Sequence, residues 1–221
     1  MRTGISRWAT ASLALLALAT PARAFPRFAR ATKAACAACH ANPAGGLELT
    51  DAGKAFKADS TKVPAAGAAG AEYVGSTRCR MCHSAQAQSW ATTPHAHAFE
   101  PLKAAHDAIV AAMARRLHAE VKGKASESEA CVVCHVTGFQ LAGGYPAADS
   151  TKNASLANVT CEACHGPGSR HLAAPISMKK KMINRAVTAS LCTQCHTPAM
   201  SPGFNFEGFR KRGVHAMKAR G

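Results

Sequence analysis

Five copies of the sequence Cys-x-x-Cys-His occur in this chain, and together they use all ten of its cysteines. Two thiols three residues apart lie on one face of a helical turn, where they can form thioethers with the two vinyl groups of one haem. The histidine that follows can then bind the haem iron. Because no cysteine is left over, little room remains for a zinc site or a disulfide framework. The sequence therefore predicts five covalently bound haem c groups, as in a multihaem cytochrome c.

We number the five motifs in chain order and use these numbers throughout. The cysteines expected to bind haem are Cys36 and Cys39 in the first motif, Cys79 and Cys82 in the second, Cys131 and Cys134 in the third, Cys161 and Cys164 in the fourth, and Cys192 and Cys195 in the fifth. The expected proximal iron ligands are, in the same order, His40, His83, His135, His165 and His196.

The first 24 residues have the pattern of a secretory signal peptide. Arg2 and Arg7 form a charged start, a short apolar run includes residues 13–19, and Ala22-Arg23-Ala24 forms a cleavage site before Phe25. The alternative, a membrane anchor, is disfavoured because the apolar run is too short to span a bilayer. Covalent haem attachment occurs outside the cytoplasm, so the signal and the motifs agree. We expect a periplasmic or extracellular protein with no transmembrane segment.

Removal of residues 1–24 from the 221-residue chain leaves 197 residues for five haems, and only 5% of the whole chain is aromatic. Such a chain can hardly build a conventional core around each cofactor, so the porphyrins should form much of the interior. We therefore expect a mainly α fold with extensive loop, short helices at the motifs, a haem-packed core and little or no β-sheet.

The motifs divide the chain unevenly. Residues 25–59 hold the first motif, and Thr50 or Asp51 is expected to cap a short helix around residues 54–57. Residues 60–72 are rich in Ala, Gly and Pro, which is typical of a flexible linker, although an ordered loop packed on the haem is an equal alternative. Residues 73–221 hold the other four motifs, at spacings too irregular for a solenoid repeat.

One longer helix is expected between Leu102 and Val121, where helix breakers are few. Val110, Met113, Leu117 and Val121 recur at helical spacing, which favours core packing. Gly123 follows its expected end. Residues 141–158, which contain Gly143, Gly144 and Pro146, are expected to form a loop between the third and fourth motifs.

Residues 73–215 resemble the cytochrome c-554 family of tetrahaem cytochromes. The resemblance rests on several stretches in the right order: Tyr73-Val74-Gly75-Ser76, residues 82–90, Thr93-Pro94-His95-Ala96-His97-Ala98, residues 134–139, Gly143-Gly144-Tyr145 and residues 159–168. It implies a mainly helical fold, haems in close parallel and perpendicular pairs, and electron transfer. The first motif lies outside this resemblance, as an added single-haem segment with a weaker likeness to other multihaem cytochromes.

Six histidines remain besides the five proximal ones, and neutral imidazole suits haem iron as a sixth ligand. The resemblance implies that His95, His171 and His215 bind iron. His97 is expected to be a supporting or surface group. In the family, the haem that corresponds to the third motif can lack a sixth ligand. His106 and His118 could close that iron or reach the first haem, and Met113 is a weaker candidate for a ligand.

The formal charge falls from +15 to +12 when Arg2, Arg7 and Arg23 are removed, and haem propionates alter it further. Residues 179–181 and 210–212 are basic runs that could pair with propionates or steer an acidic redox partner. No nucleic-acid motif is present. We expect an electron carrier rather than an enzyme. The alternatives are a multihaem oxidoreductase acting on a small nitrogen compound at an open haem, and a subunit of an extracellular cytochrome filament.

Overall fold

A computed structural model describes residues 26–64 and 70–216. The expected signal peptide, residues 1–24, lies outside this range, as do residues 65–69 of the expected linker. The described residues form fourteen α-helices and three 3₁₀-helices and contain no strand. The expectation of a mainly helical fold with extensive loop and little β-structure is confirmed. None of the described helices is long and apolar enough to cross a membrane.

The N-terminal segment contains three helices that surround the first motif: α1 (Pro26–Thr32), α2 (Cys36–Cys39) and α3 (Asp51–Ala58). The expected capping of α3 is confirmed, because the hydroxyl oxygen of Thr50 accepts a hydrogen bond from the backbone N–H of Gly53 at 3.1 Å. The backbone N–H of Thr50 in turn donates to the carbonyl of Cys39 at 3.1 Å. Helix α3 is thereby fixed against the turn that carries the first motif.

The rest of the described chain is a series of short helices joined by loops. Those before the third motif are α4 (Ser76–Arg80), α5 (Ser84–Ala91), η1 (Pro94–His97), α6 (Glu100–Lys103), α7 (Asp107–Leu117) and η2 (Ala125–Glu127). Those that follow are α8 (Glu129–Val132), η3 (Ser150–Lys152), α9 (Asn153–Leu156), α10 (Cys161–His165), α11 (Ser169–Ala173), α12 (Ile176–Lys179), α13 (Ala189–Cys192) and α14 (Phe206–Gly213). The expected loop 141–158 thus contains two short helices, η3 and α9.

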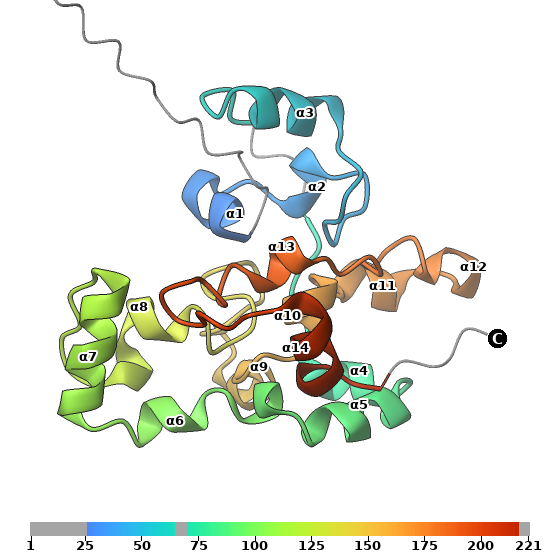
Figure 1. Ribbon diagram of the computed structural model, residues 1–221. Coiled ribbons are helices and arrows are strands. Elements are labelled where there is room, and N and C mark those ends of the chain that lie inside the picture. The colour runs from blue at the N-terminus through green and yellow to red at the C-terminus, as the bar shows by residue number, and fades with distance from the viewer. Residues whose placement is uncertain (1–25, 65–69, 217–221) are drawn as a thin grey trace, which may run out of the picture.

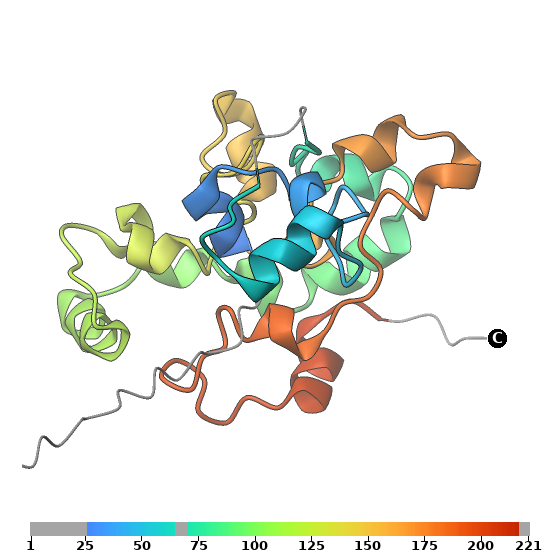
Figure 2. The ribbon, with the colours of Figure 1, turned by 90° about the horizontal axis from the view of Figure 1, so that it is seen from above.

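The expected helix from Leu102 to Val121 is interrupted, and this part of the prediction is wrong. Helix α6 ends at Lys103, and α7 begins only after His106, whose backbone is extended. Helix α7 ends at Leu117 because His118 adopts the left-handed conformation, with φ of 49°. Helix α7 buries no residue and stands at the edge of the molecule (Figures 1 and 2). Val110, Met113 and Leu117 are half-buried and do not form a core.

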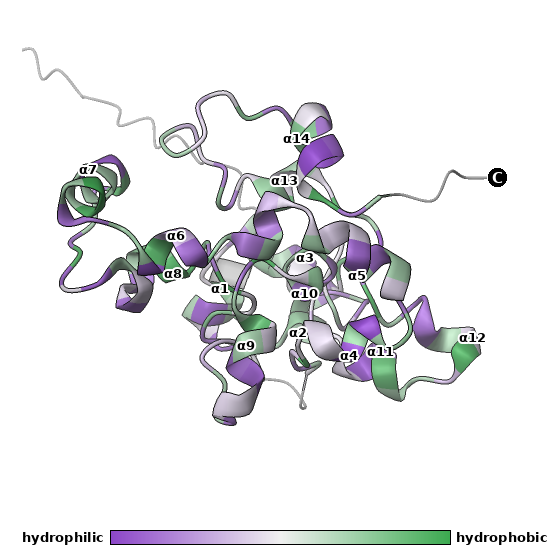
Figure 3. Ribbon diagram, turned by 90° about the horizontal axis from the view of Figure 1, so that it is seen from below, coloured by the Kyte–Doolittle hydropathy of each residue, from purple (hydrophilic) through white to green (hydrophobic). Residues whose placement is uncertain are grey.

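The apolar core of the polypeptide is small. Phe99, Val132, Val136 and Phe139 are buried together, and half-buried side chains such as Leu102 pack around them. An isolated β-bridge joins Val136 to Ala157 beside this cluster. Figure 3 shows hydrophilic and hydrophobic residues mixed along most helices, without one continuous apolar interior. Such an interior is consistent with a core completed by cofactors.

The N-terminal helices lie on the remainder of the molecule, above α10 and α13 (Figure 1). The side-chain amide of Asn42 donates to the carbonyl of Ile183 at 3.0 Å. A Cβ atom added to Gly166 would lie 1.9 Å from the carbonyl oxygen of Ala44, so the two backbones are in close contact. The segment that carries the first motif is therefore packed closely against the region of the fourth motif.

Candidate haem-binding centres

Each motif forms a helical turn that brings its histidine next to its cysteines. In the first, second and fifth motifs, the histidine N–H donates to the carbonyl of the first cysteine at 2.9, 2.9 and 3.0 Å. The fourth motif is helical along its whole length, as α10. One turn therefore presents two thiols and an imidazole together, which is the arrangement that attachment of one haem requires.

Three of the proximal histidines face a second histidine from a distant part of the chain. An iron held by two imidazole nitrogens at about 2 Å separates the ring centroids by roughly 6 Å, since each nitrogen lies about 1 Å from its centroid. The observed pairs have this spacing: His83 and His171 at 6.2 Å, His95 and His196 at 6.0 Å, and His165 and His215 at 6.1 Å. The second members are the three histidines that the family resemblance indicated.

The Nδ1 atoms of most of these histidines are already engaged. A carbonyl oxygen can only accept a hydrogen bond, so an Nδ1 atom bonded to one carries the proton and leaves Nε2 free for a metal. The contacts are His95 to Gly213 at 2.6 Å, His165 to Asn184 at 2.7 Å, His171 to Lys179 at 2.9 Å, His215 to Ala216 at 3.0 Å, and a short bond from His135 to Ala98. His196 Nδ1 lies 2.9 Å from the Ser201 hydroxyl.

Burial lowers the pKa values of His40, His165 and His196 below their ordinary range. Neutral imidazole is the form that binds iron, so burial and the Nδ1 hydrogen bonds act in the same direction. These observations fit haem. Three haems would be held by the cysteines and proximal histidines of the second, fourth and fifth motifs, that is, by His83, His165 and His196. Their second ligands would be His171, His215 and His95, in the same order. The bound iron would supply one-electron chemistry.

Cysteines of different motifs also meet. Cys79 of the second motif contacts Cys161 of the fourth through their side chains. Cys134 of the third motif contacts Cys195 of the fifth in the same way. Because each of these sulfurs marks the edge of a haem site, the second and fourth sites are direct neighbours, and so are the third and fifth.

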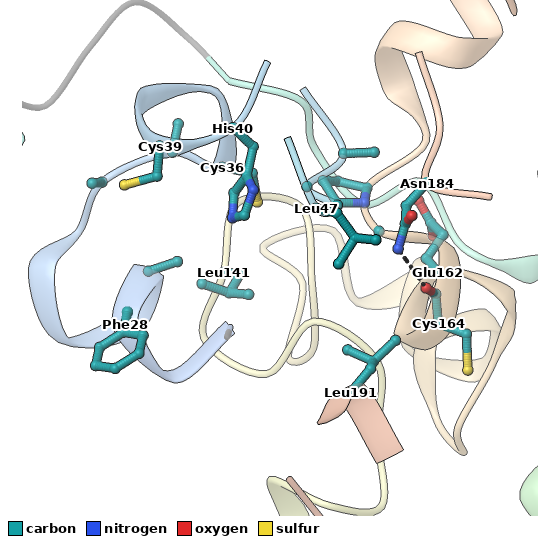
Figure 4. A pocket seen from close by; sticks show the side chains of 18 of the residues that line it. Phe28, Cys36, Cys39, His40, Leu47, Leu141, Glu162, Cys164, Asn184 and Leu191 are labelled. Carbon is teal, nitrogen blue, oxygen red and sulfur yellow. Dashed lines mark hydrogen bonds between the residues drawn. The ribbon is translucent and has the colours of Figure 1, made fainter. Parts of the chain in front are cut away.

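The first motif opens into a cavity of about 160 Å³ that is continuous with solvent. Figure 4 shows the His40 ring entering this cavity, with Phe28 and Leu141 on the opposite side. Cys164 and Leu191 also line it, so the cavity extends to the fourth and fifth motifs. The Nδ1 atom of His40 is buried without a hydrogen-bond partner of acceptable geometry, although the carbonyls of Gly46 and Glu48 lie near the ring.

The other predicted histidines are not brought to a haem site. His97 is exposed, and its Nε2 lies 3.1 Å from the carbonyl of Ala91, so the nitrogen that would bind iron is engaged. His106 and His118 flank α7 at the edge of the molecule and are exposed. Within the described residues, neither forms a ring pair with His135 or His40, and Met113 on α7 is half-buried.

Sequence reasoning missed Glu162, which lies between the two cysteines of the fourth motif and is only 2% exposed. Its carboxylate accepts backbone N–H bonds from Val74 at 3.0 Å, Gly75 at 2.8 Å and Gly168 at 2.7 Å. Burial raises its pKa above the ordinary range, while these bonds act against the rise. A carboxylate inside a haem motif, next to a Gly-Pro-Gly turn, was the available signal. In the structure, the carboxylate of Glu162 joins the extended segment before α4 to the turn after α10.

Comparison with known proteins agrees with this geometry. The family model described as cytochrome c554 and c-prime matches residues 78–166. Cytochrome c-554 of Nitrosomonas europaea is 41% identical over 109 residues, which cover 46% of this chain and 41% of that protein. Over the matched residues, the chain is similar to the cytochrome c-554 family. The structure of reduced cytochrome c554 from the same organism matches with a TM-score of 0.51 and 27% identity, over 66% of this chain and 86% of that one.

These matches support a multihaem c-type cytochrome with covalently bound haem c. The family model begins at residue 78 and therefore excludes the first motif. The chain spans about two fifths of the length of the sequence relative, so the activity of that whole protein is not transferred here. The first motif therefore lies outside the family match, although residues of the matched part, such as Leu141 and Cys164, also line the cavity at His40.

Proposed function

We propose that this chain is a secreted pentahaem cytochrome that carries electrons between redox partners in the periplasm or outside the cell. The observation that carries this proposal is the arrangement of the sites. Three imidazole pairs at 6.0–6.2 Å fit irons closed on both faces, and closed irons exchange electrons without binding substrate. The sulfur contacts between motifs support short paths from site to site.

The chain's own residues would hold and tune these sites. The backbone carbonyls at the Nδ1 atoms fix the tautomer and the ring orientation, and they raise the basicity of the nitrogen that faces the iron. Tyr73, Val132 and Phe139 are buried near the motifs and exclude water. Both effects influence the reduction potential of a bound haem.

The proposed domain organisation is a cleaved signal of residues 1–24, a single-haem segment of residues 25–59, a connection of residues 60–72 and a tetrahaem domain of residues 73–221. We propose five haems in total. Intact-mass measurement of the secreted protein should give a chain that begins near Phe25 with five haem masses added, and reductive titration should take up five electrons. Four or fewer haems, from a host that matures c-type cytochromes, would overturn the count.

A second function is favoured by one observation at the third motif. The His135 ring has no second histidine opposite it within the described residues, so its haem would be open to a small nitrogen compound. The reduced protein should be mixed with hydroxylamine or nitrite without oxygen. If the protein gives up no more than five electrons per chain, the result supports electron carriage. If hydroxylamine or nitrite continues to be consumed when an electron donor is supplied, the result supports catalysis.

A further inference from the structure

The first motif differs from the three paired sites in what surrounds its histidine. The cavity at His40 is lined mostly by apolar side chains, among them Phe28, Ala34, Phe56 and Leu141. Phe28 and Phe56 also contact each other edge to face, with centroids 5.3 Å apart. This aromatic contact joins α1 to α3 and closes one end of the cavity.

No described histidine, methionine or lysine is placed to bind an iron opposite His40. The residues that line the cavity include no second histidine, no methionine and no lysine. Elsewhere in the described chain, His95, His171 and His215 are already paired, and His97 is bonded through Nε2. His106 and His118 flank α7, which lies far from α2 in both Figure 1 and Figure 2.

The electrostatics of the cavity indicate which ligand could enter. No lysine or arginine lines it, whereas the buried side chain of Glu162 is part of its wall. A ferrous haem has no net charge at its centre, so an anion would lose its hydration without gaining a positive partner, and an anionic ligand is disfavoured in the reduced protein. A small uncharged molecule has no such penalty in apolar surroundings.

We propose that the haem held by Cys36, Cys39 and His40 is five-coordinate, and that its free face binds a small uncharged diatomic molecule of the class of carbon monoxide, nitric oxide or dioxygen. This inference rests on the proposed presence of a fifth haem. It assigns a ligand site to the haem of the one motif that lies outside the family match. The site is distinct from the haem of the third motif, which lies beside α8.

The test is carbon monoxide binding to the fully reduced protein, counted per chain against the haem number from intact mass. The variant C36A/C39A removes only the first attachment site, so it should carry four haems and bind one carbon monoxide fewer than the wild type. Azide, an anion, should not bind at this site in the reduced protein. Equal carbon monoxide counts in a five-haem wild type and a four-haem variant would overturn the inference, because the first iron would then be closed.

A second variant keeps all five haems and guards against misfolding of C36A/C39A. Leu141→His places an imidazole across the cavity from His40 and should convert one high-spin iron to low spin, with loss of one carbon monoxide site. The matched control, Leu141→Gln, adds a polar side chain of similar size that is no haem ligand, so the iron should stay high spin. A wild type with five haems, all of them low spin, would refute the inference without any variant. A wild type with four haems would instead refute the proposed count.

Discussion

The imidazole rings of His165 and His215 lie 6.1 Å apart, centroid to centroid, with their planes inclined by 24°. His165 ends the short helix of the fourth motif, and His215 follows the last helix, α14. The backbone N–H of Ala216 donates to the Ser89 hydroxyl at 2.8 Å, which fixes the position of His215 against α5. A histidine that follows the last described helix thus lies opposite the proximal histidine of the fourth site.

Replacement of His215 by Ala should leave the covalent haem count unchanged, because the thioethers and His165 remain. One low-spin iron should become high spin and bind carbon monoxide in the reduced state, since its second imidazole is gone. Visible spectra with and without carbon monoxide measure this change. His97→Ala is the control and should have no effect on spin state. If His215→Ala binds no more carbon monoxide per chain than the wild type, the pairing of His165 with His215 does not reflect coordination.

Replacement of Glu162 by Gln should lower the stability of the fold by about 1–3 kcal/mol, because the amide nitrogen cannot accept the backbone N–H groups that the carboxylate satisfies. The native pKa of Glu162 is raised, so the folded state holds this proton more tightly than the unfolded chain. Its contribution to stability is therefore present at low pH and is lost as pH rises from the unfolded towards the native pKa. Denaturation of wild type and variant across acidic pH should show this loss only in the wild type.

Substitution of Gly166 should disturb the contact between the N-terminal segment and the fourth motif. A Cβ there would lie 1.9 Å from the Ala44 carbonyl oxygen, and φ is +75°. Gly166 has ψ of 177°, a conformation that is nearly restricted to glycine, so we expect Gly166→Ala to destabilise the protein by more than about 1 kcal/mol. Gly123→Ala is the matched control, since its φ is +72° and nothing lies within 4 Å of the added atom. If the two variants lower the thermal unfolding temperature equally, the close approach to Ala44 does not contribute to stability.

Charge near the second site should affect electron exchange with anions. Lys179 donates to the carbonyls of His171 and Leu172 at 2.9 and 3.0 Å, whereas Lys180 and Lys181 are exposed. The variant K180E/K181E should slow oxidation of the reduced protein by hexacyanoferrate several-fold at low salt and leave oxidation by an uncharged quinone unchanged. Lys57→Glu with Lys62→Glu makes the same charge change at exposed residues of the N-terminal segment. If both variants slow oxidation by hexacyanoferrate equally, the rate depends on the net charge of the protein and not on the position of these lysines.

How much could be predicted from the sequence follows from how local each feature is. Cys-x-x-Cys-His is a single helical turn, so its geometry was predictable, and the cap at Thr50 is equally local. The break at residues 104–106 and the left-handed His118 were not, because helix propensity continues through both. Leu102 packs on the core cluster while α7 buries nothing, and this tertiary difference decides where the helix is interrupted.

The pairing of histidines could not be derived from spacing alone. His95 and His196 come together only because the chain folds back, and His95 is held by the carbonyl of Gly213 on α14. Family resemblance indicated which histidines to consider, but not their partners. Glu162 was missed for a similar reason, because its three backbone donors lie in two separate segments.

The most direct test of the account is electron paramagnetic resonance of the oxidised wild-type protein with spin quantification against a haem count of five. Three closed pairs and two histidines without a described partner predict three low-spin irons, at the second, fourth and fifth motifs, and two high-spin irons, at the first and third. Five low-spin irons would contradict the open sites. Fewer than three would contradict the histidine pairs on which the proposed electron carrier rests.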